Sequence, residues 1–186
     1  MDLDAIKKSP ARNSDLGCVS RLSSKPILKS IRIDLADFIS SPSIVVNPSG
    51  DSAILSQYRF SPFVFLENNP AFDPVLIIPR PHMSLKFDFN FAKASGGDGE
   101  FGAFLLDQSG MPMGQPFEFF IVDSGKGTVS FDLSSLPLKP VGLVIILTET
   151  NFTVETCGSS IKISNVRISS NDPKQRHIRR LQTFST

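Results

Sequence analysis

The segment Ser84-Leu85-Lys86-Phe87-Asp88-Phe89-Asn90-Phe91 decides the fold class of this chain. In it, leucine and three phenylalanines alternate with serine, lysine, aspartate and asparagine. Successive side chains of a β-strand point to opposite faces, so the apolar residues share one face and the polar residues share the other. The segment is therefore predicted to be a strand whose four apolar side chains lie in a core.

Short apolar or alternating segments of the same kind occur on both sides of this strand. The chain holds 14 Pro and 12 Gly in 186 residues, and turns rich in these residues separate the segments. No stretch is long enough for a crossover helix. About ten short strands separated by such turns predict an all-β protein, a two-sheet antiparallel β-sandwich with jelly-roll-like connections. The predicted strands cover residues 27–33, 43–46, 53–57, 60–66, 75–78, 84–91, 101–107, 117–122, 128–132, 141–149 and 160–169.

Two features of these strands go beyond simple alternation. Residues 60–66 and 141–147 are apolar on both faces, which predicts strands held between the core and a covering loop. In the last strand the apolar positions change face near Asn165, which predicts a β-bulge.

Charge divides the chain into an acidic body with basic ends. The net charge of the whole chain is +1, so it has no bulk attraction to nucleic acid or membrane. Residues 1–32 carry +4, the last 16 residues carry +3, and the body between them carries −6. We predict a polar basic tail over 1–26, a β-sandwich domain over 27–170 and a basic tail over 171–186, with both tails disordered.

Cellular location stays unassigned at this point. No apolar run reaches the 18 residues of a membrane-spanning helix, and no secretory signal or C-terminal sorting segment is visible. Cys18 and Cys157 are too few for a disulfide scaffold. We interpret both as free thiols, with a single bridge between them as the alternative.

Catalytic chemistry is not expected from the residues present. The histidines are His82, just before the 84–91 strand, and His177 in the basic tail, so a nucleophilic device would have to use His82. Its expected role is that of a strand-entry side chain, and nothing in the spacing brings Cys157 to it. Close His or Cys pairs for zinc are lacking, and the Gly-rich loop at 95–100 lacks the Lys-Ser or Lys-Thr of a phosphate loop. No acidic pair is marked for glycoside hydrolysis.

Two kinds of ligand remain open. No cofactor is expected apart from a structural calcium ion, for which Asp98 and Glu100 are the candidate ligands, with solvated turn residues as the alternative. Carbohydrate binding usually depends on flat aromatic platforms, but the chain has no Trp and one Tyr, Tyr58, and its 16 Phe are expected mostly in the core. Polar loop residues such as Asn68, Asn69, Asp98 and Glu100 could instead bind sugar hydroxyls.

Five motifs follow one another along the chain: Gly50–Ser56, Leu85–Phe91, Phe101–Asp107, Val129–Ser134 and Ile161–Ile168. Their order resembles that in jelly-roll modules of exported bacterial surface proteins of the PEP-CTERM type and, more distantly, in carbohydrate-binding-module-like sandwiches. The likeness covers residues from about 44 to 169. It implies a non-catalytic binding or adhesion module of surface or extracellular type, with a carbohydrate or a protein as its ligand.

A structural role is the alternative. In this hypothesis the protein is a self-assembling, capsid- or coat-like jelly-roll subunit that forms homo-oligomers. The basic tails would then reach neighbouring subunits or nucleic acid.

Overall fold

The computed structural model describes residues 30–57, 63–72, 77–97, 99–149 and 158–171. Within these ranges the chain forms eleven strands and one short 3-10 helix, which confirms the all-β prediction. None of the helical residues in these ranges forms a helix long and apolar enough to cross a membrane. The predicted tail over 1–26, both cysteines and His177 lie outside the described residues, as does the tail over 171–186 except for Asn171.

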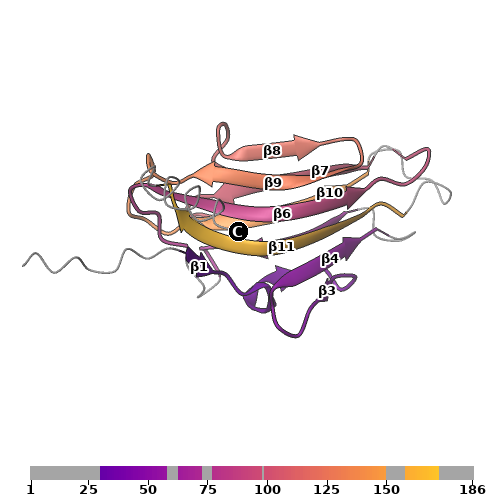
Figure 1. Ribbon diagram of the computed structural model, residues 1–186, viewed down its shortest axis with the longest axis horizontal. Coiled ribbons are helices and arrows are strands. Elements are labelled where there is room, and N and C mark those ends of the chain that lie inside the picture. Colours follow the sequence, from indigo (N-terminus) through magenta and orange to yellow (C-terminus); the bar gives the residue numbers. More distant parts are fainter. Residues whose placement is uncertain (1–29, 58–62, 73–76, 98, 150–157, 172–186) are drawn as a thin grey trace, which may run out of the picture.

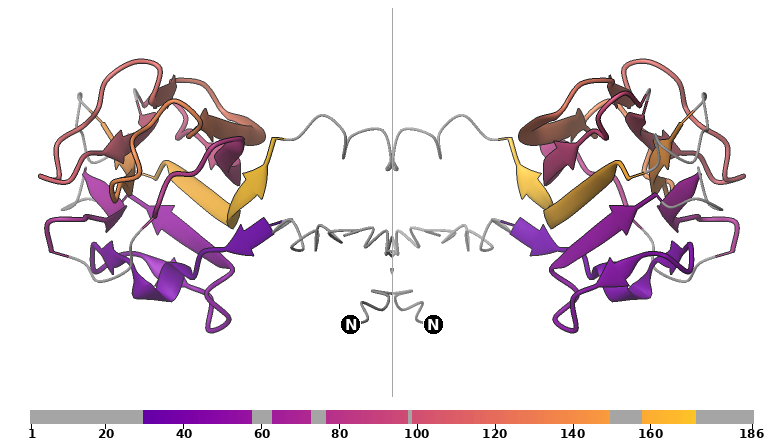
Figure 2. Two further views of the ribbon diagram at one scale, coloured as in Figure 1. Left: turned by 90° about the vertical axis from the view of Figure 1, so that its left-hand side faces the viewer. Right: turned by 90° about the vertical axis from the view of Figure 1, so that its right-hand side faces the viewer.

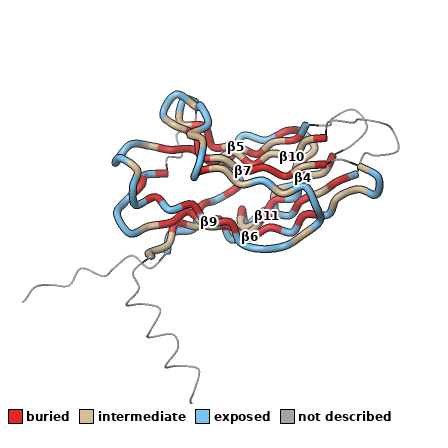
Figure 3. Tube along the Cα trace, turned by 90° about the horizontal axis from the view of Figure 1, so that it is seen from above, coloured by how far each residue is buried: buried red, intermediate tan, exposed pale blue. Residues whose placement is uncertain are grey.

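The strands form two antiparallel sheets that pack face to face (Figures 1 and 2). Figure 3 shows β5, β7 and β10 in one layer and β6, β9 and β11 in the other, with buried segments between the layers. Sheet A has the order β3 (Val45–Val46), β4 (Ser52–Ser56), β11 (Ser160–Ser170), β6 (Met83–Ala92) and β9 (Gly125–Asp132), and β1 (Ser30–Arg32) also pairs with β11. Sheet B has the order β2 (Ile39–Ser40), β5 (Val64–Asn68), β10 (Gly142–Thr148), β7 (Glu100–Leu106) and β8 (Glu118–Ile121).

The connections are those of a jelly roll. From β4 onward the chain passes repeatedly from one sheet to the other, so that β4-β11-β6-β9 faces β5-β10-β7-β8. The first and last of these strands are neighbours, as are the second and the second-last. This nesting of hairpins is the double Greek key of jelly-roll sandwiches.

The decisive strand lies at the centre of the core. Leu85, Phe87, Phe89 and Phe91 are 0, 0, 8 and 1% exposed, as the alternation predicted. The ring of Phe89 packs against that of Phe101 from the opposite sheet, with centroids 5.3 Å apart. Removal of this apolar surface from water is the main force that holds the two sheets together.

The bulge predicted in the last strand is present. The pairing of β11 with β6 shifts between Ser164 and Arg167, and Asn165 has a φ of 55°. Asparagine tolerates this left-handed conformation better than most residues. The bulge therefore lets β11 keep apolar side chains in the core on both sides of Asn165.

The start of β9 differs from the prediction. A turn was expected over Asp123–Gly127, but the strand begins at Gly125, which pairs with Phe91. A Cβ on Gly127 would lie 3.2 Å from Cε1 of Phe89. Glycine is present here because the phenylalanine ring approaches the backbone closely, not because the chain turns.

The region before β3 also holds elements that the sequence did not predict. These are the 3-10 helix η1 (Leu35–Asp37) and the two-residue strand β2. The Asp34 carboxylate accepts a hydrogen bond of 3.0 Å from the Ala36 backbone N–H and so caps η1. Gly50 has a φ of 63°, and a Cβ there would overlap Asp34. In the strand predicted over 75–78, the described residues form only an isolated bridge between Ile77 and Val141.

Candidate functional site

The outer face of sheet B is apolar and partly open to solvent. Phe120 is 46% exposed and Phe63 is 50% exposed. A covering loop was predicted over residues 60–66 and 141–147, but Phe63, within the first of these segments, is in contact with solvent. Exposed apolar patches on a folded protein commonly mark binding surfaces. We call the following outward-facing set the phenylalanine face: Phe63, Phe65, Phe104, Phe120, Val144 and Ile146.

Strand register arranges this face in straight lines across the sheet. Phe65 of β5 lies opposite Ile146 of β10, and Ile146 lies opposite Gly102 of β7, which lies opposite Phe120 of β8. The adjacent line contains Glu67, Val144, Phe104 and Glu118 in the same strand order. Four neighbouring strands therefore contribute to one continuous surface.

Gly102 fixes the position of the Phe120 ring. A Cβ on Gly102 would lie 3.1 Å from Cε1 of Phe120 and 3.1 Å from Cγ1 of Ile146. The ring thus covers the glycine, and it meets Phe104 in an edge-to-face arrangement with centroids 4.9 Å apart. Aromatic side chains that cover a glycine on a neighbouring strand stabilise sheet pairing. Here the same packing holds two rings in place at the surface.

The aromatic side chains form two separate pairs. Phe63 and Phe65 have ring centroids 5.9 Å apart next to and within β5. Phe104 and Phe120 form the other pair on β7 and β8. Because β10 lies between β5 and β7, Phe104 is on a strand about 10 Å from that of Phe65, and Phe120 is on the next strand beyond it.

Carboxylates border the phenylalanine face. Glu67 and Glu118 occupy the line of Phe104, and Glu100 lies on β7 two residues before Gly102. Partial burial raises the pKa of Glu67. The five strands of sheet B contain three glutamates and no lysine or arginine. This surface therefore combines aromatic rings with hydrogen-bond acceptors of negative charge.

The outer face of sheet A is polar and internally bonded around Asp88 on β6, β9 and β11, whereas Val45 and Ile54 are exposed apolar residues at its β3–β4 edge. The Asp88 carboxylate accepts hydrogen bonds of 2.6 Å from the Thr128 hydroxyl and 2.7 Å from Nδ2 of Asn165. The Arg167 guanidinium lies 3.8 Å from the same carboxylate. The Thr128 hydrogen bond, followed by that from Asn165, lowers the pKa of Asp88. The polar groups around Asp88 on sheet A therefore bond to one another, which is typical of a solvated sheet surface.

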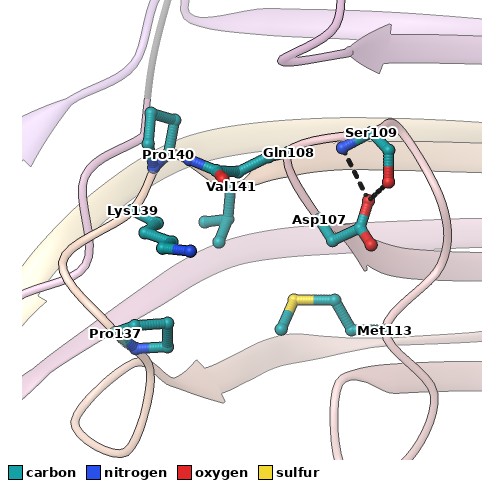
Figure 4. Close-up of a pocket in the computed structure, with 8 residues that line it drawn as sticks. All are labelled: Asp107, Gln108, Ser109, Met113, Pro137, Lys139, Pro140 and Val141. Atoms are coloured by element: carbon teal, nitrogen blue, oxygen red, sulfur yellow. Dashed lines mark hydrogen bonds between the residues drawn. The ribbon is translucent and has the colours of Figure 1, made fainter.

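A cavity of about 460 Å³ lies at one end of the sandwich, between the loop after β7 and the loop before β10 (Figure 4). Figure 4 shows Lys139 and Asp107 on opposite sides of this cavity. Oδ1 of Asp107 accepts hydrogen bonds from the Ser109 backbone N–H at 2.8 Å, the Ser109 hydroxyl at 2.8 Å and the Met111 backbone N–H at 3.0 Å. These bonds, that from Met111 first, lower the pKa of Asp107. Its carboxylate thus serves mainly to hold its own turn.

The residues proposed for calcium are only partly placed. Glu100 begins β7 and lies opposite Thr148 on the outer face of sheet B. Asp98 lies outside the described residues. In the part of the chain that the structure describes, no three His, Cys, Asp or Glu side chains form a group that could hold a metal ion. The calcium site stays a prediction.

Two polar residues considered for sugar binding are unsuitable. Asn68 is fully buried and Asn69 is 8% exposed. Oδ1 of Asn69 accepts a 3.0 Å hydrogen bond from the Ala71 backbone N–H and so stabilises its turn. Burial keeps both side chains away from a ligand at the surface, and the prediction that these two contact sugar hydroxyls is wrong.

His82 has the role expected from its position. It lies in the turn just before β6, has a φ of 60°, and its carbonyl oxygen accepts a 2.6 Å hydrogen bond from the Asn171 backbone N–H. The Asp132 carboxylate accepts a hydrogen bond from the Ser134 backbone N–H, and the hydrogen bonds from Ser134 lower the pKa of Asp132. Cys157, the other member of the pair considered for catalysis, lies outside the described residues.

One buried carboxylate was not predicted from the sequence. Glu149 follows β10 and is 8% exposed, and among the residues that the structure describes neither of its carboxylate oxygens has a hydrogen-bond partner. A buried charge without a partner reduces the stability of the folded state. The only signal in the sequence was a glutamate directly after an apolar strand.

Comparisons with known proteins show similarity at the level of the fold. No protein-family model matches the chain, and no curated protein matches it. A carbohydrate-binding module of family 61, solved with β-1,4-galactotriose, has 10% identity and a TM-score of 0.48 over 74% of this chain and 90% of that chain. A family 30 carbohydrate-binding module has 11% identity and a TM-score of 0.37 over 72% of this chain and 83% of that chain.

Enzymes are also among the similar structures. An arabinose-bound α-L-arabinofuranosidase has 17% identity and a TM-score of 0.37, and the match covers 78% of this chain but 22% of the enzyme. At these values the similarity does not identify ligand-binding residues in this chain. They have to be found from its own surface.

Proposed function

We propose that this protein is a non-catalytic carbohydrate-binding module and that its phenylalanine face holds an extended glycan chain. The observation that supports this most is the packed pair of rings formed by half-buried Phe104 and exposed Phe120, with Glu118 beside them. Phenylalanine was expected mostly in the core, and these two rings are the part of the set that reaches the surface.

The chemistry of the face suits a sugar. The C–H groups on one side of a pyranose ring carry partial positive charge and pack on the negative face of an aromatic ring. Hydroxyl groups at the edge of the sugar can donate hydrogen bonds to carboxylates such as Glu67 and Glu118, and these charge-assisted bonds are stronger than neutral ones. Aromatic rings bordered by a few polar groups are the usual composition of small-ligand sites.

The spacing of the two aromatic pairs favours an extended chain over a single sugar. The pairs lie on either side of β10, with Phe104 two strand spacings and Phe120 three strand spacings from β5. A chain that crosses the strands would therefore contact both phenylalanine pairs, with Val144 and Ile146 between them.

Affinity electrophoresis tests this proposal. The gels contain hydroxyethylcellulose, β-1,4-galactan, xyloglucan or arabinoxylan. We expect wild type to be retarded by at least one polymer and Phe104→Ala/Phe120→Ala to bind it at least about tenfold more weakly. Ile54→Ala is the matched control, because Ile54 is an exposed apolar residue on sheet A. Migration unaffected by every glycan, or equal loss in Ile54→Ala, would contradict the proposal.

Self-assembly is the alternative that this face must be tested against. A second copy of the chain could cover exposed phenylalanines, as in the coat-like subunit hypothesis. Size-exclusion chromatography with light scattering at two salt concentrations separates the two functions. We expect a monomer at both concentrations. A dimer that Phe120→Ala dissociates would instead assign the face to assembly. Action at a cell surface and kinship with PEP-CTERM-type proteins stay predictions.

A further inference from the structure

The two sheets carry opposite charge. The six strands of sheet A contain five basic and two acidic residues, whereas the five strands of sheet B contain three glutamates and no basic residue. This difference is hidden in the whole chain, whose net charge is +1. Any ligand on the phenylalanine face therefore meets negative charge only, as far as the strands of sheet B are concerned.

The glutamates lie where a glycan chain would pass. Glu118 is directly opposite Phe104 on the neighbouring strand, and Glu67 lies in the same line on the far side of Val144. Glu100 lies on β7, two residues before Gly102 and on the same face of the sheet. A chain held by both phenylalanine pairs would thus pass Glu67 and Glu118 on one side and Glu100 on the other.

We infer that the phenylalanine face selects uncharged glycans and rejects glycans that carry carboxylate or sulfate groups. The inference rests on the proposed function and adds the class of substrate. Carboxylates accept hydrogen bonds from neutral hydroxyl groups, but they repel another anion at the same distance. Specificity often depends on such repulsion of the wrong ligand as well as on attraction of the right one. The partly buried position of Glu67 weakens solvent screening of its charge.

Paired derivatives of one polymer give the test. Glucan, galactan and xylan are each prepared with hydroxyethyl groups and with carboxymethyl groups at the same degree of substitution, so that the members of a pair differ mainly in charge. Affinity electrophoresis at low salt should show wild type binding the hydroxyethyl form at least about tenfold more tightly than the carboxymethyl form of the same polymer. Salt should narrow this ratio because it screens repulsion.

Two variants assign the selectivity to the face. Glu67→Gln/Glu118→Gln should reduce the preference for the neutral form at least about threefold. Asp37→Asn/Asp51→Asn is the matched control, since it changes the net charge by the same amount but alters no strand of sheet B. It should leave the preference unchanged. A circular dichroism spectrum and melting temperature confirm that each variant is folded.

The outcomes separate this inference from the proposed function. Equal binding of both forms by wild type, or an unchanged ratio in Glu67→Gln/Glu118→Gln, overturns the selectivity and leaves glycan binding in place. Tighter binding of a carboxymethyl form also overturns it. If wild type binds none of the six polymers, the proposed function fails and the selectivity fails with it.

Discussion

The outer faces of sheet A and sheet B differ in charge, in aromatic content and in how their polar groups are bonded. On sheet A, Asp88 is bonded to Thr128 and Asn165 and lies near Arg167. On sheet B, phenylalanine occupies the corresponding outward positions, and its rings pack against one another. Both faces come from strands of the same sandwich, so the core alone does not explain the difference.

The contrast shows which of the two surfaces leaves groups without a favourable partner in the isolated protein. The Asp88 group on sheet A is largely satisfied by its own hydrogen bonds and by water. The phenylalanine face instead leaves apolar area in contact with water, which is unfavourable for the isolated protein. A ligand that covers this area would gain the free energy that the isolated face lacks. The following substitutions test this distinction.

Truncation of a phenylalanine should have its largest effect on stability inside the sandwich. Phe89→Ala removes a ring that packs against both Phe101 and Phe119, so we expect a loss of about 3 to 5 kcal/mol in the free energy of unfolding. Phe120→Ala on the outer face should cost about 1 kcal/mol, because that ring is already 46% exposed. Urea denaturation of both variants gives the comparison. Equal losses would mean that the outer face is as enclosed as the core.

Two glycines separate core crowding from ligand binding. Gly127 is itself exposed, and Gly127→Ala places a methyl group against the ring of the buried Phe89, which should cost about 1 to 3 kcal/mol with no change in glycan affinity. Gly102 is buried beneath Phe120, and Gly102→Ala places the methyl group against the half-exposed Phe120 ring and against Ile146. There the crowding is offset by the roughly 0.5 to 1 kcal/mol that alanine gains over glycine in a strand.

We therefore expect Gly102→Ala to retain most of its stability and to bind glycan several-fold more weakly, since the Phe120 ring must move. Thermal melting and affinity electrophoresis measure the two effects. Full affinity in Gly102→Ala would show that the position of this ring is unimportant for binding.

The carboxylate of Glu149 lies on neither outer face. Its substitution should raise the stability of the fold, whereas the substitutions above lower it. Its oxygens are buried and have no hydrogen-bond partner among the described residues, so Glu149→Gln should raise the free energy of unfolding by about 1 to 2 kcal/mol at neutral pH. Thermal melting with and without a chelator measures it. A lower melting temperature in Glu149→Gln, together with a chelator effect seen in wild type alone, would instead indicate that this carboxylate holds a cation.

The bonded network on sheet A should give a small, pH-dependent effect. Its hydrogen bonds lower the pKa of Asp88, so its stabilisation is complete above the pKa of the unfolded chain, about 4, and is lost as the pH falls through the lower pKa of the folded protein. Asp88→Asn should cost about 1 kcal/mol at pH 7 and less at pH 3. Melting temperatures at both values measure it. A gap that widens at pH 3 would contradict this account, as would any effect on glycan affinity.

Much of the fold follows from local sequence patterns, whereas the site depends on how strands are placed together. Alternation alone placed Phe87 and Phe89 in the core, and the change of face near Asn165 revealed the bulge. The short strand β2 could not be predicted, because two residues hold no periodicity. Gly127 was assigned to a turn, since a glycine that permits close approach of a ring looks the same in sequence as a glycine in a turn.

The sequence contained a signal for the candidate site, but we interpreted it as evidence of a covering loop. Residues 60–66 and 141–147 are apolar on both faces, and this was attributed to a covering loop. The distinction between a covered strand and an exposed binding surface needs the pairing of β5 with β10 and of β7 with β8, which joins Phe65, Ile146 and Phe120 in one line. No local pattern contains that register.

The most direct measurement is an NMR titration of the labelled full-length protein with neutral hexasaccharides of β-1,4-linked glucose, galactose and xylose. If the phenylalanine face binds uncharged glycan, at least one of these should shift the backbone signals of Gly102, Phe104 and Ile146 and leave those of Asp88 and Thr128 unchanged. Shifts centred on β6, β9 and β11 of sheet A, or no shift with any of the three, would contradict the central claim.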